Sequence, residues 1–326
     1  MTSKWKFART STVALLCACL VGGCGNYSND DLDFQLALPE QGDMDAKLQV
    51  SVSRDDSAEY YRATRDAVSE FNSLVFALTA LVEAVRGYTP TSRNGDERTW
   101  GPFADDKHPG WETRVVMRRS TESQTLLHMD YWVQVRQVGQ DDSGWVSLLV
   151  GQYTSQGSAR TGYGEIHFNV QTARAATYPV DSDPGLVNLD HLDVCYDRSG
   201  NPSACPNENG GVAFVDMRIV NLSSATTKVG HYVYELAEDN SGHMQFDWQG
   251  TTDSGLPITA TMDSRWLASS AGRADLVVDL TPNLPNETTL GTDCWGVDTV
   301  AAYSYRLRDD VTQQKRDQGD ASLCVF

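Results

Sequence analysis

Apolar residues recur with two different periods along this 326-residue chain, and the change of period separates a helical part from a β-rich part. Between residues 57 and 86 they recur at alternating steps of three and four, the spacing of one buried helix face. Asp56 followed by Glu59 resembles a capping box, and Gly87 is a favourable C-terminal stop. The pattern predicts one long helix over 57–86, whose apolar face carries Tyr61, Thr64, Val68, Phe71, Val75, Leu78, Val82 and Val85.

From about residue 100 onward the period falls to two, as expected for strands with one apolar and one polar face. In residues 243–249, for example, Met244, Phe246 and Trp248 alternate with polar side chains. Segments rich in Gly, Asn, Asp and Ser separate the runs, so successive strands are expected to pair antiparallel. The predicted strands are 112–119, 126–138, 145–154, 163–171, 191–196, 212–221, 230–237, 243–249, 257–267, 274–281 and 299–308.

The apolar faces of these strands need a cover, and the helix 57–86 is the obvious one. We therefore expect a mainly β (α+β) fold, a curved antiparallel meander or unclosed barrel of roughly eleven strands packed on one long N-terminal helix. This order of elements resembles that of the periplasmic lipoprotein carriers and their outer-membrane lipoprotein relatives, which form unclosed barrels.

The first residues have the pattern of an export signal. MTSKWKFARTS carries Lys4, Lys6 and Arg9 without an acidic residue, and an apolar run of about a dozen residues follows, from Thr12 to Gly23. A basic region, a short apolar region and small residues at the exit are typical of a secretory signal peptide. The run is shorter than the ~20 residues that a membrane-spanning helix needs.

The exit of this segment, Val21-Gly22-Gly23-Cys24, resembles the lipobox of bacterial lipoproteins. The resemblance implies that residues 1–23 are removed and that Cys24 becomes the lipid-modified first residue, while Cys17 and Cys19 leave with the signal. Several acyl chains anchor a protein stably where one chain is marginal. The alternatives are an ordinary secreted protein with a chance cysteine near the cut, and a poorer second lipobox at Leu16–Cys19.

Three parts follow from this interpretation: a signal peptide over 1–23, the lipidated cysteine and a tether over 24–54, and a single β-rich domain over 55–326. Gly25 after the cysteine resembles the export signal to the outer membrane of a Gram-negative bacterium. TWGPF at 99–103, GWETRVVMRR at 110–119 and the terminal CW…SLCVF resemble uncharacterised β-rich envelope lipoproteins of the myxobacterial type. That resemblance implies no known activity.

The net charge of the chain limits the classes of molecule that we expect it to bind. Without residues 1–23, which hold three basic and no acidic residues, 23 basic and 44 acidic residues remain, a net charge of −21. Nucleic acids are bound through clusters of Lys and Arg, so this balance argues against a nucleic-acid partner. The expected membrane contact is the lipid at Cys24.

Four cysteines remain after Cys24, and an even number in an exported chain suggests disulfides, with three possible connectivities. Spacing favours Cys195–Cys205, around a Ser-Gly-Asn-Pro turn, and Cys294–Cys324. Neither pair is CxxC, so redox exchange and structural zinc are poorly supported, and we predict structural bridges.

No catalytic or cofactor motif is apparent, and we predict no cofactor and no enzymatic activity. Glu165 and His167 share a face of one predicted strand and could join an acid–base or metal site, although a solvated polar face is the simpler interpretation. Asp181–Gly185 begins like a calcium loop but lacks further ligands.

Seven tryptophans remain after the signal, and they could fill the core or line an apolar cavity between sheet and helix. We therefore predict a lipoprotein that binds a lipid or other apolar ligand there. The alternative is a structural or adhesion module of the envelope that binds a protein or glycan partner.

Overall fold

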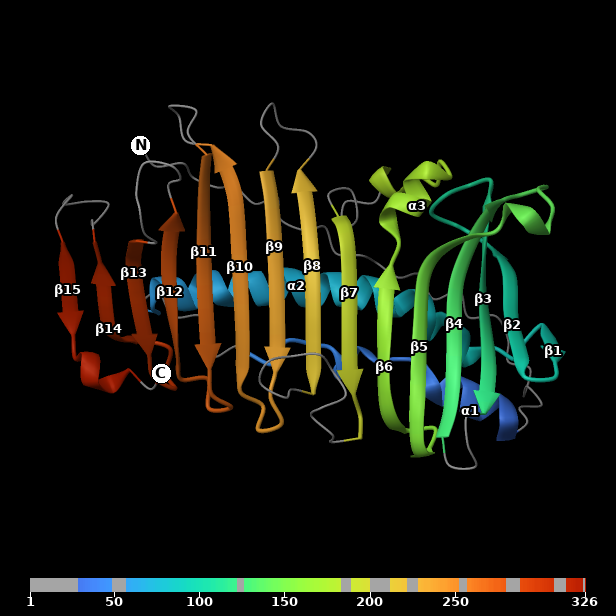
Figure 1. The fold of residues 1–326 in the computed structure, drawn as a ribbon, viewed down its shortest axis with the longest axis horizontal. Coiled ribbons are helices and arrows are strands. Elements are labelled where there is room, and N and C mark those ends of the chain that lie inside the picture. The colour runs from blue at the N-terminus through green and yellow to red at the C-terminus, as the bar shows by residue number, and fades with distance from the viewer. Residues whose placement is uncertain are drawn as a thin grey trace.

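The computed structural model describes residues 29–48, 57–121, 126–182, 189–199, 212–221, 228–251, 257–279, 288–307, 315–324 and 326. These residues form a mainly β structure, in which fifteen antiparallel strands follow one another in a single unclosed sheet with β1 and β15 at its edges (Figure 1). The strands are β1 (Ser92–Asn94), β2 (Glu97–Ala104), β3 (Trp111–Thr121), β4 (Leu126–Gln137), β5 (Val146–Ser158), β6 (Thr161–Phe168), β7 (Leu189–Asp197), β8 (Ala213–Asn221), β9 (Lys228–Leu236), β10 (Gly242–Thr251), β11 (Pro257–Trp266), β12 (Gly272–Asp279), β13 (Thr288–Trp295), β14 (Ala301–Arg306) and β15 (Arg316–Gly319). The predicted β-rich antiparallel meander is confirmed.

The prediction of roughly eleven strands is wrong, since the described residues form fifteen: four strands were missed because they lack a clean alternation of apolar and polar residues. β1 (SRN) and β15 (RDQG) are edge strands without a large apolar side chain, and β2 contains a Gly-Pro step. β13 (TTLGTDCW) places a buried carboxylate, Asp293, where an apolar residue would be expected. A pattern with a period of two therefore detects only the strands whose inner face is apolar throughout.

Among the described residues, three α-helices accompany the sheet: α1 (Asn29–Ala37), α2 (Glu59–Glu83) and α3 (Val170–Ala175). Short 3-10 turns are η1 (Gln41–Asp43), η2 (Ala84–Gly87), η3 (Asp142–Gly144), η4 (Val180–Ser182) and η5 (Ala321–Leu323). The predicted helix 57–86 corresponds to α2 and η2. None of the helices in the part of the chain that the structure describes has both the length and the hydrophobicity of a membrane span.

Seven residues of the stripe expected on α2 are buried with 0–2 % exposure: Tyr61, Thr64, Val68, Phe71, Val75, Val82 and Val85. The proposed N-cap, Asp56, lies outside the described residues. At the observed start of α2, the backbone N–H of Tyr60 donates to Asp293 Oδ2 of β13 at 2.9 Å, and Arg306 of β14 binds both Asp293 and Glu59. A carboxylate of the sheet therefore accepts one of the backbone donors that the helix leaves open.

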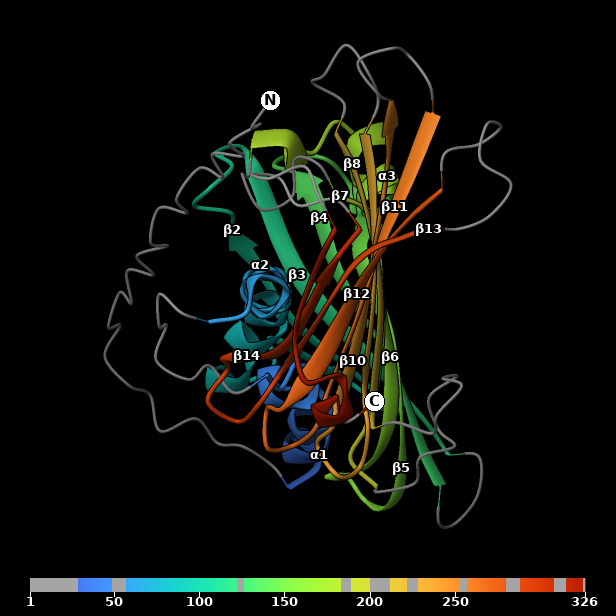
Figure 2. The same ribbon diagram turned by 90° about the vertical axis from the view of Figure 1, so that its left-hand side faces the viewer.

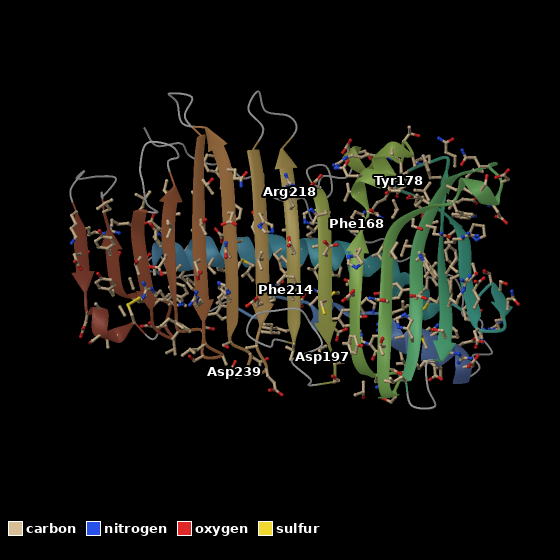
Figure 3. The ribbon with its side chains drawn as sticks, in the orientation of Figure 1. Phe168, Tyr178, Asp197, Phe214, Arg218 and Asp239 are labelled. Atoms are coloured by element: carbon tan, nitrogen blue, oxygen red, sulfur yellow. A yellow bond between two sulfur atoms is a disulfide. The ribbon has the colours of Figure 1, made fainter. Side chains whose placement is uncertain are left out.

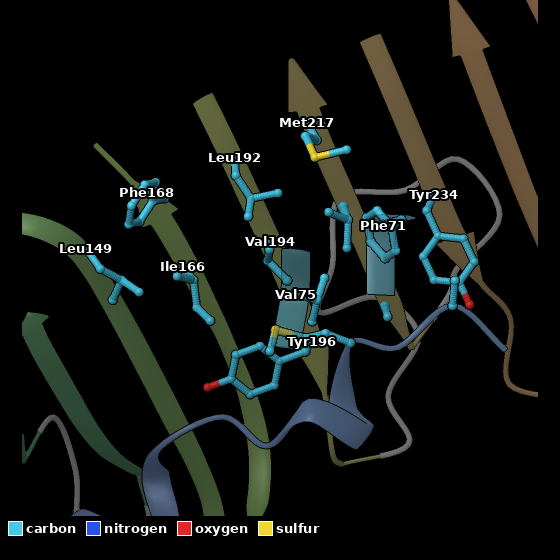
Figure 4. Close-up of a cluster of buried hydrophobic side chains, with 14 of the residues drawn as sticks. Phe71, Val75, Leu149, Ile166, Phe168, Leu192, Val194, Tyr196, Met217 and Tyr234 are labelled. Carbon is cyan, nitrogen blue, oxygen red and sulfur yellow. The ribbon is translucent and has the colours of Figure 1, made fainter. Parts of the chain in front are cut away.

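Side chains of α2 meet side chains of the sheet at several points. Tyr61 and Trp295 lie edge to face at 5.6 Å, and Phe71 lies 5.5 Å from Tyr234 between ring centres (Figure 4). Thr64 Oγ1 is 2.8 Å from Ser264 Oγ. Figure 2 shows α1 and α2 on the same side of the strands.

Four large aromatic residues of the buried face lie directly opposite glycines on the neighbouring strand. The pairs are Tyr131–Gly151, Tyr196–Gly164, Trp266–Gly242 and Trp295–Gly272. A Cβ added at any of these glycines would come within 2.1–2.6 Å of the ring opposite. Each ring therefore occupies the space above its glycine, a known way of stabilising glycine within a sheet.

Residues 44–48 lie between α2 and strands β9–β11. Asn72 of α2 accepts from the N–H of Ala46 at 2.7 Å and donates to its carbonyl oxygen at 3.1 Å. On the other side Tyr234 Oη accepts from Lys47 N, and Trp266 Nε1 donates to Lys47 O. The segment before α2 is thus part of the core of the domain, and Met44, Ala46 and Leu48 are buried.

Candidate functional site

The structure joins one of the two predicted cysteine pairs. Cys294 of β13 and Cys324 are linked by a disulfide with an S–S distance of 2.09 Å. Cys195 of β7 is also disulfide-bonded, but Cys205 and the lipidation candidate Cys24 lie outside the described residues. The Cys195–Cys205 pairing and the modification of Cys24 stay predictions.

The tryptophans are divided between core and surface. Trp100, Trp266 and Trp295 are buried with 0–2 % exposure, as expected for core filling. Trp145 is partly exposed between the guanidinium groups of Arg114 (4.2 Å) and Arg136 (4.3 Å). In the segment Asp181–Gly185, which begins like a calcium loop but lacks further ligands, Asp181 binds Arg174 at 3.0 Å, and Asp183 lies outside the described part.

The side of β6–β11 that faces away from α1 and α2 is lined by carboxylates, histidines and arginines, and we call it the polar face. It consists of Glu165, His167, His191, Asp193, Phe214, Asp216, Arg218, His231, Glu235, His243, Asp247, Asp263 and Arg265, which are opposite or adjacent in the strand register. Phe214 and Arg218 mark it on β8 (Figure 3). Between 47 and 55 % of the side-chain surface of Arg218, Asp193, His167 and Arg265 is exposed. This half of the sheet therefore presents hydrogen-bonding groups to solvent.

A chain of alternating histidines and carboxylates crosses the polar face around Asp216. The Oδ1 atom of Asp216 lies 2.7 Å from His231 Nε2 and 3.4 Å from His191 Nε2. His231 Nδ1 is in turn 3.6 Å from Asp247 Oδ2. The predicted pair Glu165–His167 is 3.8 Å apart and belongs to the same pattern, because His167 Nδ1 is 2.7 Å from Asp193 Oδ1.

His243 lies between two carboxylates of this face, with its Nδ1 3.6 Å from Glu235 Oε2 and its Nε2 3.3 Å from Asp263 Oδ1. The carboxylate of Asp263 raises the pKa of His243 despite partial burial. Burial opposes ionisation of Asp263, but the charges of His243 and Arg265 outweigh it and lower the pKa of that carboxyl. Each ionised group stabilises the other.

A pocket of about 500 Å³ opens next to the polar face, at the end of the sheet formed by β12–β15. We call it the β12–β15 pocket; its lining is Arg273, Thr292, Tyr303, Tyr305, Lys315, Asp317, Ala321, Cys324 and Phe326. The strand residues face one side because they are register partners across β12–β15. The segment around η5 forms the remaining wall, and the Cys294–Cys324 disulfide holds that wall to β13.

The β12–β15 pocket combines two phenol rings with hydrogen-bond donors and acceptors. Arg273 donates to Asp275 (Nε to Oδ2, 2.7 Å) and to the carbonyl oxygen of Phe326 (3.1 Å). Lys315 Nζ is 5.2 Å from the Tyr305 ring centre and 3.7 Å from Asp317. The Tyr303 hydroxyl is a donor at neutral pH, as in any tyrosine, and desolvation and the nearby Asp317 raise its pKa further.

Comparison with known proteins identifies no relative: no protein-family profile, curated protein or solved structure matches the chain. Within the described ranges, no group of three or more His, Cys, Asp or Glu residues could hold a metal ion. The site must therefore be interpreted from its own chemistry.

Sequence reasoning missed this pocket. Tyr303 and Tyr305 lie in the predicted strand 299–308, and their alternation with Ala302 and Ser304 was a sufficient signal that both rings share one face. Arg273 and Lys315 had no such signal, because the pocket exists only where the chain after β15 turns back onto β13.

Proposed function

We propose that this protein is an envelope lipoprotein, lipidated at Cys24 and held at the outer membrane, whose exposed sheet surface binds a glycan. The observation that carries the proposal is the β12–β15 pocket. Sugars present apolar C–H faces and a rim of hydroxyls, and a site for them needs aromatic rings beside mixed donors and acceptors. Tyr303 and Tyr305 supply the rings, and Arg273, Lys315, Thr292 and Asp317 supply the polar groups.

The polar face extends this surface. Carboxylates and imidazoles bind hydroxyl groups as acceptors and donors, and the face continues from β12 through β6 without a change of side. A polymer bound at the β12–β15 pocket would therefore have further polar partners along the strands. Binding, rather than catalysis, is the proposed activity.

The apolar-ligand hypothesis places its ligand between sheet and helix, and the observed packing supports the glycan alternative better. We propose that α2 covers the apolar face of a curved sheet, and the contacts Tyr61–Trp295, Phe71–Tyr234 and Thr64–Ser264 support that arrangement. Side chains rather than an open cavity occupy these points. The 500 Å³ pocket lies outside this layer, on strands β12–β15.

The binding proposal is tested with the unlipidated domain on an array of bacterial oligosaccharides and polysaccharides. We expect binding to a defined set of glycans that Tyr305→Ala reduces at least about tenfold, equivalent to ~1.4 kcal/mol. The matched control is Tyr88→Ala, which removes an equally large and 52 % exposed ring elsewhere. Absence of glycan binding, or equal binding by Tyr305→Ala, would overturn the proposal. A co-purifying lipid in native mass spectrometry would instead favour the apolar ligand.

The anchor is tested separately in cells. Cys24→Ala should abolish incorporation of radiolabelled palmitate and release the protein from the membrane fraction, because the thiol receives the lipid. Continued labelling of the variant would refute an anchor at this residue.

A further inference from the structure

The first turn of α1 is fixed to strands β1–β3 by ion pairs. Asp31 is completely buried and binds two arginines, with Arg98 Nε 2.8 Å and Arg93 Nη2 2.9 Å from its carboxylate. Asp30 binds Arg98 and Arg119. The ring of Phe34, also fully buried, lies beneath the guanidinium groups of Arg98 (4.9 Å) and Arg119 (5.2 Å). Detachment of α1 from this end of the sheet would therefore leave buried charges without their partners.

The number of residues between the proposed anchor and this clamp is small. Cys24 and Asn29, the first residue of α1, are five residues apart. Five residues span at most about 18 Å in any conformation. The clamped end must therefore stay within that distance of a lipid attached at Cys24.

Strands β12–β15, whose side chains line the pocket, lie at the other end of the sheet from β1–β3 (Figure 1). Eleven strand spacings separate β3 from β14, and at ~4.8 Å each they amount to roughly 50 Å measured along the sheet. From these two distances we infer that α1 and strands β1–β3 form the membrane-facing surface of the domain, and that the pocket is presented on the side remote from the bilayer. This inference rests on the proposed lipidation of Cys24.

The charge of the clamped end fits a lipid surface. Together, α1 and strands β1–β3 carry five arginines against three aspartates and two glutamates and are balanced in charge, whereas the whole chain has 26 basic and 44 acidic residues. The side chains of Arg93 and Arg118 are 42 and 62 % exposed. Anionic headgroups attract arginine and repel carboxylates, so they disfavour contact with the acidic polar face and permit contact with β1–β3. The ligand of the pocket is then a molecule of the aqueous space and not a lipid of the anchoring membrane.

The test uses the lipidated full chain in phosphatidylcholine vesicles that contain a headgroup-quenching lipid. A fluorophore is attached, under non-reducing conditions, at Asn94→Cys on β1 or at Gln318→Cys on β15, two exposed positions at opposite ends of the sheet. We expect several-fold stronger quenching at residue 94 than at residue 318. Equal quenching at both positions, or stronger quenching at residue 318, would overturn the inference.

Two controls separate the orientation from the anchor itself. If the chain takes up no palmitate and does not float with vesicles, the proposed lipidation fails and the orientation fails with it. If the chain floats but both labels are quenched equally, only the orientation is wrong. Asp31→Asn should reduce the difference between the labels while flotation is unchanged, because the clamp on α1 is weakened; an undiminished difference would show that the clamp does not set the orientation.

Discussion

Trp266 lies across the backbone of Gly242, its direct partner on the neighbouring strand. A Cβ at Gly242 would come within 2.4 Å of two atoms of the indole ring. The ring is fully buried, and its Nε1 donates to the carbonyl oxygen of Lys47 at 3.1 Å. Because residue 242 has no side chain, the Trp266 ring can occupy this position and bind the backbone of residues 44–48, the segment before α2.

Gly242→Ala should destabilise the domain by ~1–3 kcal/mol, because the added methyl group must displace a tightly packed indole. The matched control is Gly230→Ala on the adjacent strand β9, where the nearest atom, in Phe246, is at 3.4 Å. That variant should stay within ~0.5 kcal/mol of the wild type. Urea unfolding of the three proteins measures the difference, and equal stabilities of the two variants would contradict the role of Trp266.

Asn72→Ala removes both hydrogen bonds between α2 and the backbone of Ala46. We expect a loss of ~1–3 kcal/mol, because partly buried backbone groups are left without a partner. Ser73→Ala is the control: its hydroxyl is exposed and donates only to Ser69 of the same helix, so its effect should be below ~0.5 kcal/mol. Similar unfolding midpoints for Asn72→Ala and Ser73→Ala would show that residues 44–48 do not depend on this contact.

The pair His243–Asp263 should make stability depend on pH. The pKa of His243 is raised, so its contribution is present below its ordinary value and is lost as pH rises through the raised pKa. The pKa of Asp263 is lowered, so its contribution is present above its ordinary value and is lost as pH falls through the lowered pKa. The stability difference between the wild type and His243→Gln should therefore be largest near pH 5 and smaller at pH 8.5, about two units above the ordinary histidine value. Urea unfolding at both pH values measures it, and a difference that grows with pH would contradict this interpretation.

The local patterns of the sequence predict the elements but not the polar contacts between them. The α2 stripe and the alternating strands are encoded in neighbouring residues, and their periods can be read directly. Asp293 on β13 breaks the alternation because its partners, Arg306 and the first turn of α2, come from distant parts of the chain. A pattern within one strand contains no information about such partners.

The same limit applies to the candidate site. The alternation in β6 correctly placed Glu165 and His167 on one face, but Asp193, the closest carboxylate to His167, belongs to β7. The β12–β15 pocket depends on the return of the chain after β15, which no periodicity encodes. The spacing of Cys294 and Cys324 was the one sequence signal of that return.

The disulfide Cys294–Cys324 should stabilise the domain and also complete the pocket. Cys324→Ser opens a bridge with a sequence separation of 30, and the chain-entropy model gives a loss of about 3–4 kcal/mol. Because Ala321, Cys324 and Phe326 form the wall opposite Tyr303 and Tyr305, glycan binding should fall at least about as much as in Tyr305→Ala. Leu323→Ala, which removes a 57 % exposed side chain and leaves the bridge intact, is the matched control for both measurements. If Cys324→Ser lost stability but bound glycans as the wild type does, the wall would be structural only, and the ligand would have to bind on the open polar face.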